Sequence, residues 1–190
     1  KKKKKLDANG QQIFFAKNGT TFGQVQTEAT PANLTFESAI SDGDIIFKGS
    51  DGGSGIEAMR IDMSEGGQVY IGKTSSDSGT AGNEFLASGR HLTTVNSTTC
   101  AIINRLGNEG TILLFEKDGT DMGSIGADGG QLYIGSGDVG LRFRYGSTDS
   151  VEPFHVGSLA IRDDGIDLGT SSSRFNDIHA TNGSIQTSDQ

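Results

Sequence analysis

The stretch that decides the fold is Val139-Gly140-Leu141-Arg142-Phe143-Arg144-Tyr145, in which each odd position is apolar and each even position is Gly or Arg. In a strand, successive side chains point to opposite faces of the sheet, so this alternation is typical of a strand with one apolar face. It predicts a half-buried strand over residues 139–145, with Arg142 and Arg144 on the solvent face.

The same alternation recurs on both sides of this stretch. Apolar Met59, Ile61 and Met63 are separated by Arg60 and Asp62, and apolar Ile166 and Leu168 flank Asp167. Apolar residues rarely follow the helical spacing i, i+3, i+4, i+7, and Gly interrupts almost every window. The sequence therefore predicts an all-β chain, with further strands over 12–16, 33–37, 44–48, 68–71, 111–116, 131–134, 159–162 and 183–187.

Turn dipeptides separate these predicted strands. Asn-Gly and Asp-Gly suit two-residue type I′ turns because both residues tolerate a positive φ. Short strands joined by such turns are typical of a β-meander. The least patterned stretch, residues 77–100, is rich in Ser, Thr and Gly and is predicted to be a loop or a junction. The dipeptides begin at Asn9, Asn18, Asp42, Asp51, Asp118, Asp128, Asp164 and Asn182.

Composition predicts a thin hydrophobic core. The chain has 190 residues, of which 29 are Gly and 2 are Pro, its hydrophobic fraction is 33%, and it contains no Trp. Glycine has no side chain to bury, so a lone chain of this length has little apolar surface with which to stabilise itself. We expect identical chains to pack against one another.

Charge and single residues exclude several kinds of partner and site. The net charge is −8 although residues 1–5 are all Lys, a run interpreted as a tag or artefact. The acidic remainder would repel phosphate, which argues against nucleic acid as a partner. Cys100 is the only cysteine, so no intrachain disulfide is possible. No apolar run has the length of a membrane span or the position of a secretory signal, so no membrane insertion is predicted.

The chain also resembles itself. Residues 13–25, IFFAKNGTTFGQV, align with residues 113–125, LLFEKDGTDMGSI, and the phrase GGQVYIG at 66–72 nearly recurs as GGQLYIG at 129–135. Units too small to bury a core alone are expected to stack, which here predicts an elongated body. The predicted organisation is a lysine run at 1–5, a first β repeat unit at 6–76, a Ser/Thr/Gly-rich junction at 77–105, a second repeat unit at 106–173 and a C-terminal segment at 174–190.

Several motifs match known sites without their structural context. Residues 67–74, GQVYIGKT, fit the phosphate-loop pattern, and residues 135–140, GSGDVG, fit the dinucleotide pattern, but neither precedes a predicted helix. We interpret Lys73 as a solvated turn residue. The acidic groups Asp42 with Asp44, and Asp163 with Asp164 and Asp167, are interpreted as turn caps rather than catalytic or calcium-binding sets. No catalytic residue, metal site or cofactor is predicted.

Two stretches resemble a known family. Met59-Arg60-Ile61-Asp62 followed by GQVYIGKT is similar to a phrase that recurs in bacteriophage tail fibres. Residues 167–189, DLGTSSSRFNDIHATNGSIQTSD, resemble the approach to the C-terminal self-cleaving intramolecular chaperone of phage tail fibres and tailspikes. In that family the chaperone cuts itself off near a Ser-Asp junction, which Ser188 and Asp189 match here. The resemblance implies that the chain either loses the chaperone by processing or is truncated before it.

The resemblance further implies a homotrimeric, intertwined fibre in the virion, made in the host cytoplasm and exposed on the phage tail. Its partners would be two more copies of this chain, other tail or baseplate proteins, and a bacterial surface glycan or outer-membrane protein. Its function would be non-catalytic host attachment. The alternatives are a glycan-cleaving tailspike and a purely structural β-repeat filament. The residues expected at or near the shared interior of the trimer are Phe14, Phe15, Phe115, Leu141, Phe143 and Tyr145.

Overall fold

The computed structural model describes residues 12–27 and 33–181, and these ranges contain strands and turns with no helix. The prediction of an all-β chain is therefore confirmed. Two compact units make up the chain, Lys1–Ile102 and Ile103–Gln190. Every strand pairing described is antiparallel, as expected for short strands joined by tight turns.

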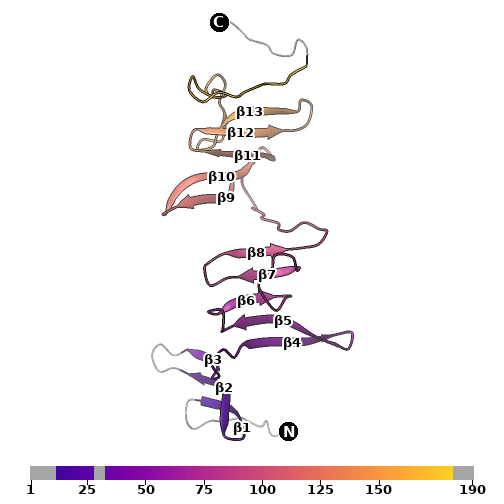
Figure 1. Cartoon of the computed structure of the whole chain (residues 1–190). Coiled ribbons are helices and arrows are strands. Elements are labelled where there is room, and N and C mark those ends of the chain that lie inside the picture. The colour runs from indigo at the N-terminus through magenta and orange to yellow at the C-terminus, as the bar shows by residue number, and fades with distance from the viewer. Residues whose placement is uncertain (1–11, 28–32, 182–190) are drawn as a thin grey trace. The chain divides into compact units, whose positions relative to one another are not determined.

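The first unit contains two sheets in which spatial order follows chain order (Figure 1). The three-stranded sheet consists of β1 (Gln12–Lys17), β2 (Thr20–Thr27) and β3 (Leu34–Ser38). The five-stranded sheet consists of β4 (Ile45–Asp51), β5 (Ser54–Asp62), β6 (Gln68–Ile71), β7 (Gly82–Phe85) and β8 (His91–Thr94).

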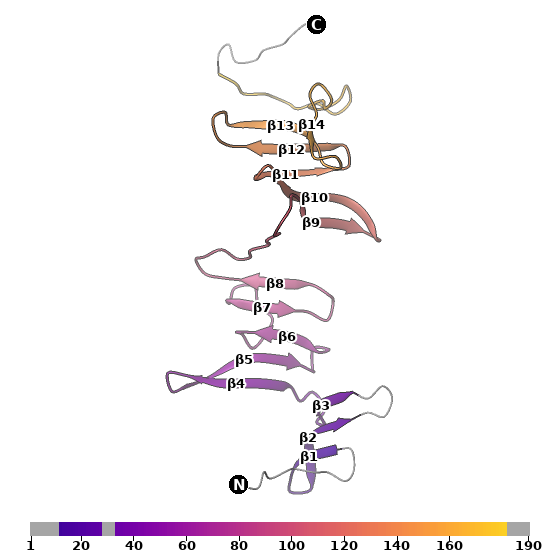
Figure 2. The ribbon, with the colours of Figure 1, turned by 180° about the vertical axis from the view of Figure 1, so that it is seen from behind.

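The second unit contains one six-stranded sheet, again with its strands in chain order (Figure 2). Each interior strand pairs with the strand before it and the strand after it in the chain, so no connection crosses the sheet. Its strands are β9 (Gly110–Lys117), β10 (Thr120–Asp128), β11 (Gln131–Ser136), β12 (Val139–Arg144), β13 (Ser150–His155) and β14 (Ala160–Ile161).

The β1–β2 and β9–β10 hairpins have the same construction. Asn18 and Gly19 join the first pair with φ of 52° and 83°, and Asp118 and Gly119 join the second with φ of 53° and 75°. Both turns thus have positive φ at the two central residues, as type I′ geometry requires. Each hairpin also contains a β-bulge, which leaves Phe22 or Met122 without a paired partner in the opposite strand.

Some predicted strands are wrong or were missed. Ile166 and Leu168 lie in an irregular segment, and the stretch 77–100 contains β7 and β8 rather than a loop alone. Those two strands pair along their backbones within the five-stranded sheet, and this pairing needs no apolar alternation. The predictions for residues 1–5, 183–187, Ser188 and Asp189 lie outside the described residues.

The core is as thin as composition predicts. Among the described residues, the hydrophobic side chains that are buried are Tyr70, Tyr133 and Phe154. Tyr133 and Phe154 contact each other, with ring centroids 5.2 Å apart. Each of the two larger sheets therefore has one partly covered face and leaves its other face open.

Candidate functional site

One face of the five-stranded sheet is apolar and open to solvent. Ile61 pairs with Ile45 and Val69, and Met59 pairs with Phe47 and Ile71, so their side chains form two adjacent rows. Phe47 is 53% exposed, Phe85 47% and Ile71 41%. We call this set the five-strand apolar face: Ile45, Phe47, Met59, Ile61, Val69, Ile71 and Phe85.

The six-stranded sheet has a matching face. Across β11, β12 and β13, Leu132, Phe143 and Val151 form one row, and Ile134, Leu141 and Pro153 form the next. Leu141 and Phe143 are 43% and 41% exposed although they lie in the middle of the sheet. Together with Ile125, which pairs with Ile134, these residues are the six-strand apolar face.

The three-stranded sheet repeats the pattern on a smaller scale. Ile13, Val25 and Phe36 lie opposite one another across its three strands, and Phe36 is 63% exposed. Phe14 and Phe15 are neighbours in β1, so their side chains point to opposite faces. Phe15 shares the face of Ile13, whereas Phe14 lies beside Gln24. One packing surface cannot take both phenylalanines.

The opposite face of the two larger sheets contains a buried tyrosine beside an arginine. The recurring phrase forms β6 in one sheet and β11 in the other, and places Tyr70 opposite Arg60 and Tyr133 opposite Arg142. Both tyrosines are 1% exposed. The recurrence in sequence therefore corresponds to a recurrence in side-chain arrangement.

Each arginine bridges two carboxylates. Arg60 donates from Nε to Glu57 Oε1 at 2.7 Å and from Nη1 to Asp44. Arg142 donates from Nη2 to Glu152 Oε2 and from Nη1 to Asp128 Oδ2, both at 2.7 Å. These hydrogen bonds from the guanidinium groups lower the pKa of Glu57 and of Glu152 below the ordinary glutamate value.

The predicted solvent exposure of Arg142 is therefore wrong, whereas the Arg144 side chain is exposed as predicted. The Arg142 side chain is only 16% exposed, and its guanidinium carbon lies 5.5 Å from the centre of the Phe154 ring, a cation–π contact. Leu141 and Phe143 are the more exposed residues. The charged network lies on the side of the sheet where Arg142 covers Phe154, and the apolar side of the strand is left uncovered.

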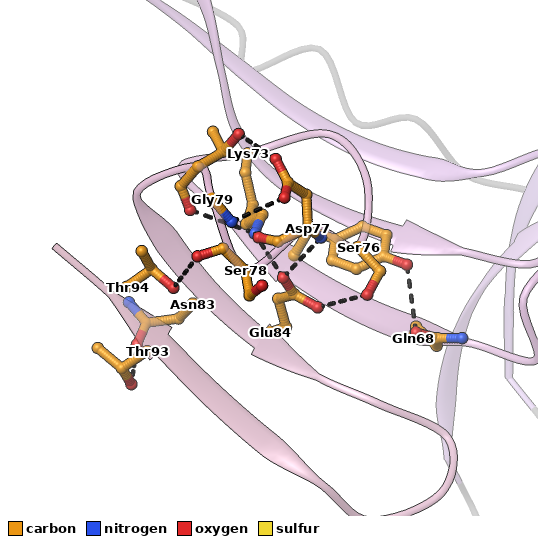
Figure 3. Close-up of polar contacts among 12 residues, drawn as sticks. Gln68, Lys73, Ser76, Asp77, Ser78, Gly79, Asn83, Glu84, Thr93 and Thr94 are labelled. Carbon is orange, nitrogen blue, oxygen red and sulfur yellow. Dashed lines mark hydrogen bonds and ion pairs between the residues drawn. The ribbon is translucent and has the colours of Figure 1, made fainter. Parts of the chain in front are cut away.

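A buried ion pair organises the loop between β6 and β7 (Figure 3). Lys73 pairs with Glu84, and each side chain is 1% exposed. Glu84 also accepts a hydrogen bond from Ser76 Oγ at 2.7 Å and from the Asp77 backbone N–H at 3.0 Å. Lys73 donates to the carbonyl oxygens of Asp77 and Thr80. Hydrogen bonding from Lys73 is the largest cause that lowers the pKa of Glu84 to about 2.

The interpretation of Lys73 as a solvated turn residue is therefore wrong. Nothing near Lys73 in the sequence signals this, because its partner lies 11 residues later in the next strand. Residues 75–81, which follow the phosphate-loop match, form a turn-rich loop. The dinucleotide match at residues 135–140 spans the β11–β12 turn, where Gly137 has φ of 55°.

Three of the acidic residues singled out in the sequence, Asp42, Asp44 and Asp164, serve local structure. Asp44 pairs with Arg60 and accepts the Met63 backbone N–H at 3.0 Å. Asp42 and Asp164 adopt positive φ in turns, consistent with the turn preference of aspartate. In the described part of the chain, no three His, Cys, Asp or Glu side chains are grouped so that they could hold a metal ion. No helix there is long and apolar enough to cross a membrane.

Each of the two larger sheets thus has an open apolar face, and on its opposite face a buried tyrosine lies beside an arginine that bridges two carboxylates. Alternation in the sequence indicates these faces, but the buried Lys73–Glu84 pair has no signal in the sequence. Searches against protein-family models, curated proteins and solved structures found nothing that matches the chain.

Proposed function

We propose that the chain is a non-catalytic segment of a bacteriophage tail fibre, in which three identical copies pack their apolar faces together and present host-binding groups at the virion surface. Attachment would then gain from avidity, because three copies of one weak site act together. The number of copies, the virion setting, the other tail or baseplate partners, and the bacterial surface glycan or outer-membrane protein as receptor follow from the family resemblance.

The observation that carries the proposal is the open apolar face of each larger sheet. Each face presents seven apolar side chains. On the five-stranded sheet the same two rows continue to Asn83, Thr93 and His91, and they contain no Asp, Glu, Lys or Arg. Leaving such contiguous apolar surface in water is unfavourable, and monomeric proteins rarely do so. A second copy of the same chain offers the same chemistry to cover it.

The charges of the chain support this choice of occupant. Outside residues 1–5, 11 Lys and Arg stand against 24 Asp and Glu, so identical copies repel wherever their charged surfaces approach. The apolar faces are the surfaces on which this repulsion is weakest. The matching β1–β2 and β9–β10 hairpins further support a repeated unit, as in a fibre.

Two measurements on the full chain test the proposal. Multi-angle light scattering should give the mass of three 19.9-kDa chains, and fluorescently labelled protein should bind some members of a panel of bacterial strains. A folded monomer would overturn the trimer. A trimer that binds no strain would leave only the structural filament, and release of reducing sugar from surface polysaccharide would instead favour the tailspike alternative.

A further inference from the structure

We infer that a cleft in the second unit is a binding site for one unit of a neutral saccharide, an inference that rests on the proposed attachment function and names its receptor chemistry. The cleft has a volume of about 470 Å³, within the range of small-molecule sites. It lies among β9, β10, β11 and the turn that follows β13.

The walls of the cleft combine aliphatic and polar side chains. Leu114, Met122, Val156 and Leu159 supply the aliphatic part, and Asp121 and Ser124 supply a carboxylate and a hydroxyl. Tyr133 also lines it, with its hydroxyl 3.3 Å from Thr111 Oγ1. An aliphatic wall beside hydroxyl and carboxylate groups suits a ring that carries both C–H and O–H groups.

Ser124 supplies a hydroxyl to the lining of the cleft. The residue is only 6% exposed, and it lines the cleft beside Asp121. A hydroxyl that lines a cleft can exchange its hydrogen bond to water for one to a ligand. A ligand that carries hydroxyl groups would therefore suit this wall.

Leu159 is held in an unfavourable conformation at the wall. Its φ is 52°, a left-handed value that a bulky residue rarely adopts. Backbone strain of this kind persists where the surrounding structure imposes it, and it is concentrated at binding sites. Here it places an aliphatic side chain on the cleft at the turn before β14.

The charge of the lining selects the ligand class. The residues that line the cleft include no Lys, Arg or His, and Asp121 is the only charged one. Asp121 would therefore repel an anionic ligand such as a phosphate or an acidic sugar, and no lining residue carries a positive charge to offset it. A neutral sugar can instead donate its hydroxyls to the Asp121 carboxylate in charge-assisted hydrogen bonds.

The cleft stays accessible in the proposed assembly. Leu114 pairs with Ser124, and Ser124 is followed by Ile125 of the six-strand apolar face. Because neighbouring side chains in a strand alternate, Ser124 points to the face of Tyr133, away from the proposed contact between copies. The same chain can therefore assemble through one face and bind a saccharide on the other.

Saturation-transfer NMR on the full chain tests the site, with glucose, galactose, mannose, N-acetylglucosamine and N-acetylgalactosamine as neutral probes and glucuronic acid as the anionic one. At least one neutral sugar should bind, and glucuronic acid should bind more weakly. Asp121→Asn should weaken that binding about tenfold or more, as expected for a hydrogen bond to a charged group, and Ser124→Ala by about threefold. The matched control is Glu116→Gln, which alters the carboxylate paired with Asp121 across the hairpin but outside the cleft lining, and it should leave binding unchanged.

The site is overturned if no neutral sugar binds, if the anionic probe binds best, or if Asp121→Asn binds like Glu116→Gln. Light scattering on the same samples separates this result from the proposed function. A trimer that binds no sugar overturns only the cleft, and a monomer that binds sugar overturns only the assembly. Circular dichroism spectra of the three variants that match the unmodified chain exclude misfolding as the cause.

Discussion

At the scale of single residues, the Lys73–Glu84 pair is the most demanding feature of the chain. Removing two opposite charges from water costs free energy that their mutual attraction recovers only with good additional hydrogen bonds. Here Ser76, Asp77 and Thr80 supply those bonds, so the pair holds the β6–β7 loop in one conformation. Its role is better described as ordering a loop than as adding stability.

Replacing one member of the pair should therefore lower the free energy of unfolding more than replacing both. We expect Lys73→Met to destabilise the fold by about 3–5 kcal/mol, because Glu84 would stay buried without its cation. The double variant Lys73→Met/Glu84→Leu should lose much less. The measurement is the free energy of unfolding in urea, and the control is Lys117→Met, whose partner Asp118 is exposed and whose loss should cost under about 1 kcal/mol. Equal losses in the single and double variants would contradict this account.

The same pair predicts sensitivity to acid. The pKa of Glu84 is lowered from 4.5 to about 2, so its contribution to stability is complete above pH 4.5 and is lost as the pH falls towards 2. The protection of the loop amides from hydrogen exchange, relative to the intrinsic exchange rate at each pH, should fall over that window. In Glu84→Gln this loss of protection should be smaller, because no carboxylate is left to protonate at this position. A loop whose exchange depends on pH in the same way in both proteins would contradict the assignment.

At the scale of strands, glycine allows Tyr133 to be buried. A Cβ on Gly126 would lie 2.4 Å from the Tyr133 ring and 2.4 Å from the Gly110 carbonyl oxygen. Gly126→Ala should thus destabilise the second unit by about 1–3 kcal/mol or more, as overpacking does. Gly49 in β4 has nothing within 4 Å of such a Cβ, and Gly49→Ala should have a small effect. The midpoints of thermal unfolding of both variants test the difference, and similar midpoints would count against it.

Alternation in the sequence identifies strands well where side chains decide the pairing. The predicted span 68–71 agrees with β6, and the predicted 139–145 with β12 to within one residue. β13 was missed because Pro153 and Glu152 interrupt its pattern, and it is held by backbone pairing to β12. Strands of that kind depend on their neighbours, which local sequence does not describe.

The candidate sites were less predictable than the strands. Alternation places Leu141 and Phe143 on one face of the strand and Arg142 on the other. It does not show which of the two faces is exposed to solvent in a lone chain. The answer depends on Asp128 and Glu152, which come from other strands to pair with Arg142. The residues that line the cleft likewise come from β9, β10, β11 and the turn after β13, so no single stretch of sequence predicts the cleft.

At the scale of the whole molecule, the proposed assembly predicts that one face is intolerant of charge. Phe143→Glu should convert the trimer to smaller species, because each copy would bury an unpaired carboxylate at the contact. The freed surface should then bind the dye ANS. Glu116→Arg places a new charge at an exposed position of β9 that alternates with Phe115, and should leave the mass unchanged. Light scattering gives the mass, and an unaltered trimer in Phe143→Glu would exclude this face from the contact.

The consecutive order of the strands bears on how the chain is made. Every pairing described joins neighbours in the sequence, so each sheet can form as soon as its last strand leaves the ribosome. Short sequence separations between contacts favour rapid folding. If the chains do associate, the slow step of maturation would then be their encounter, and its rate should rise with the concentration of newly synthesised protein.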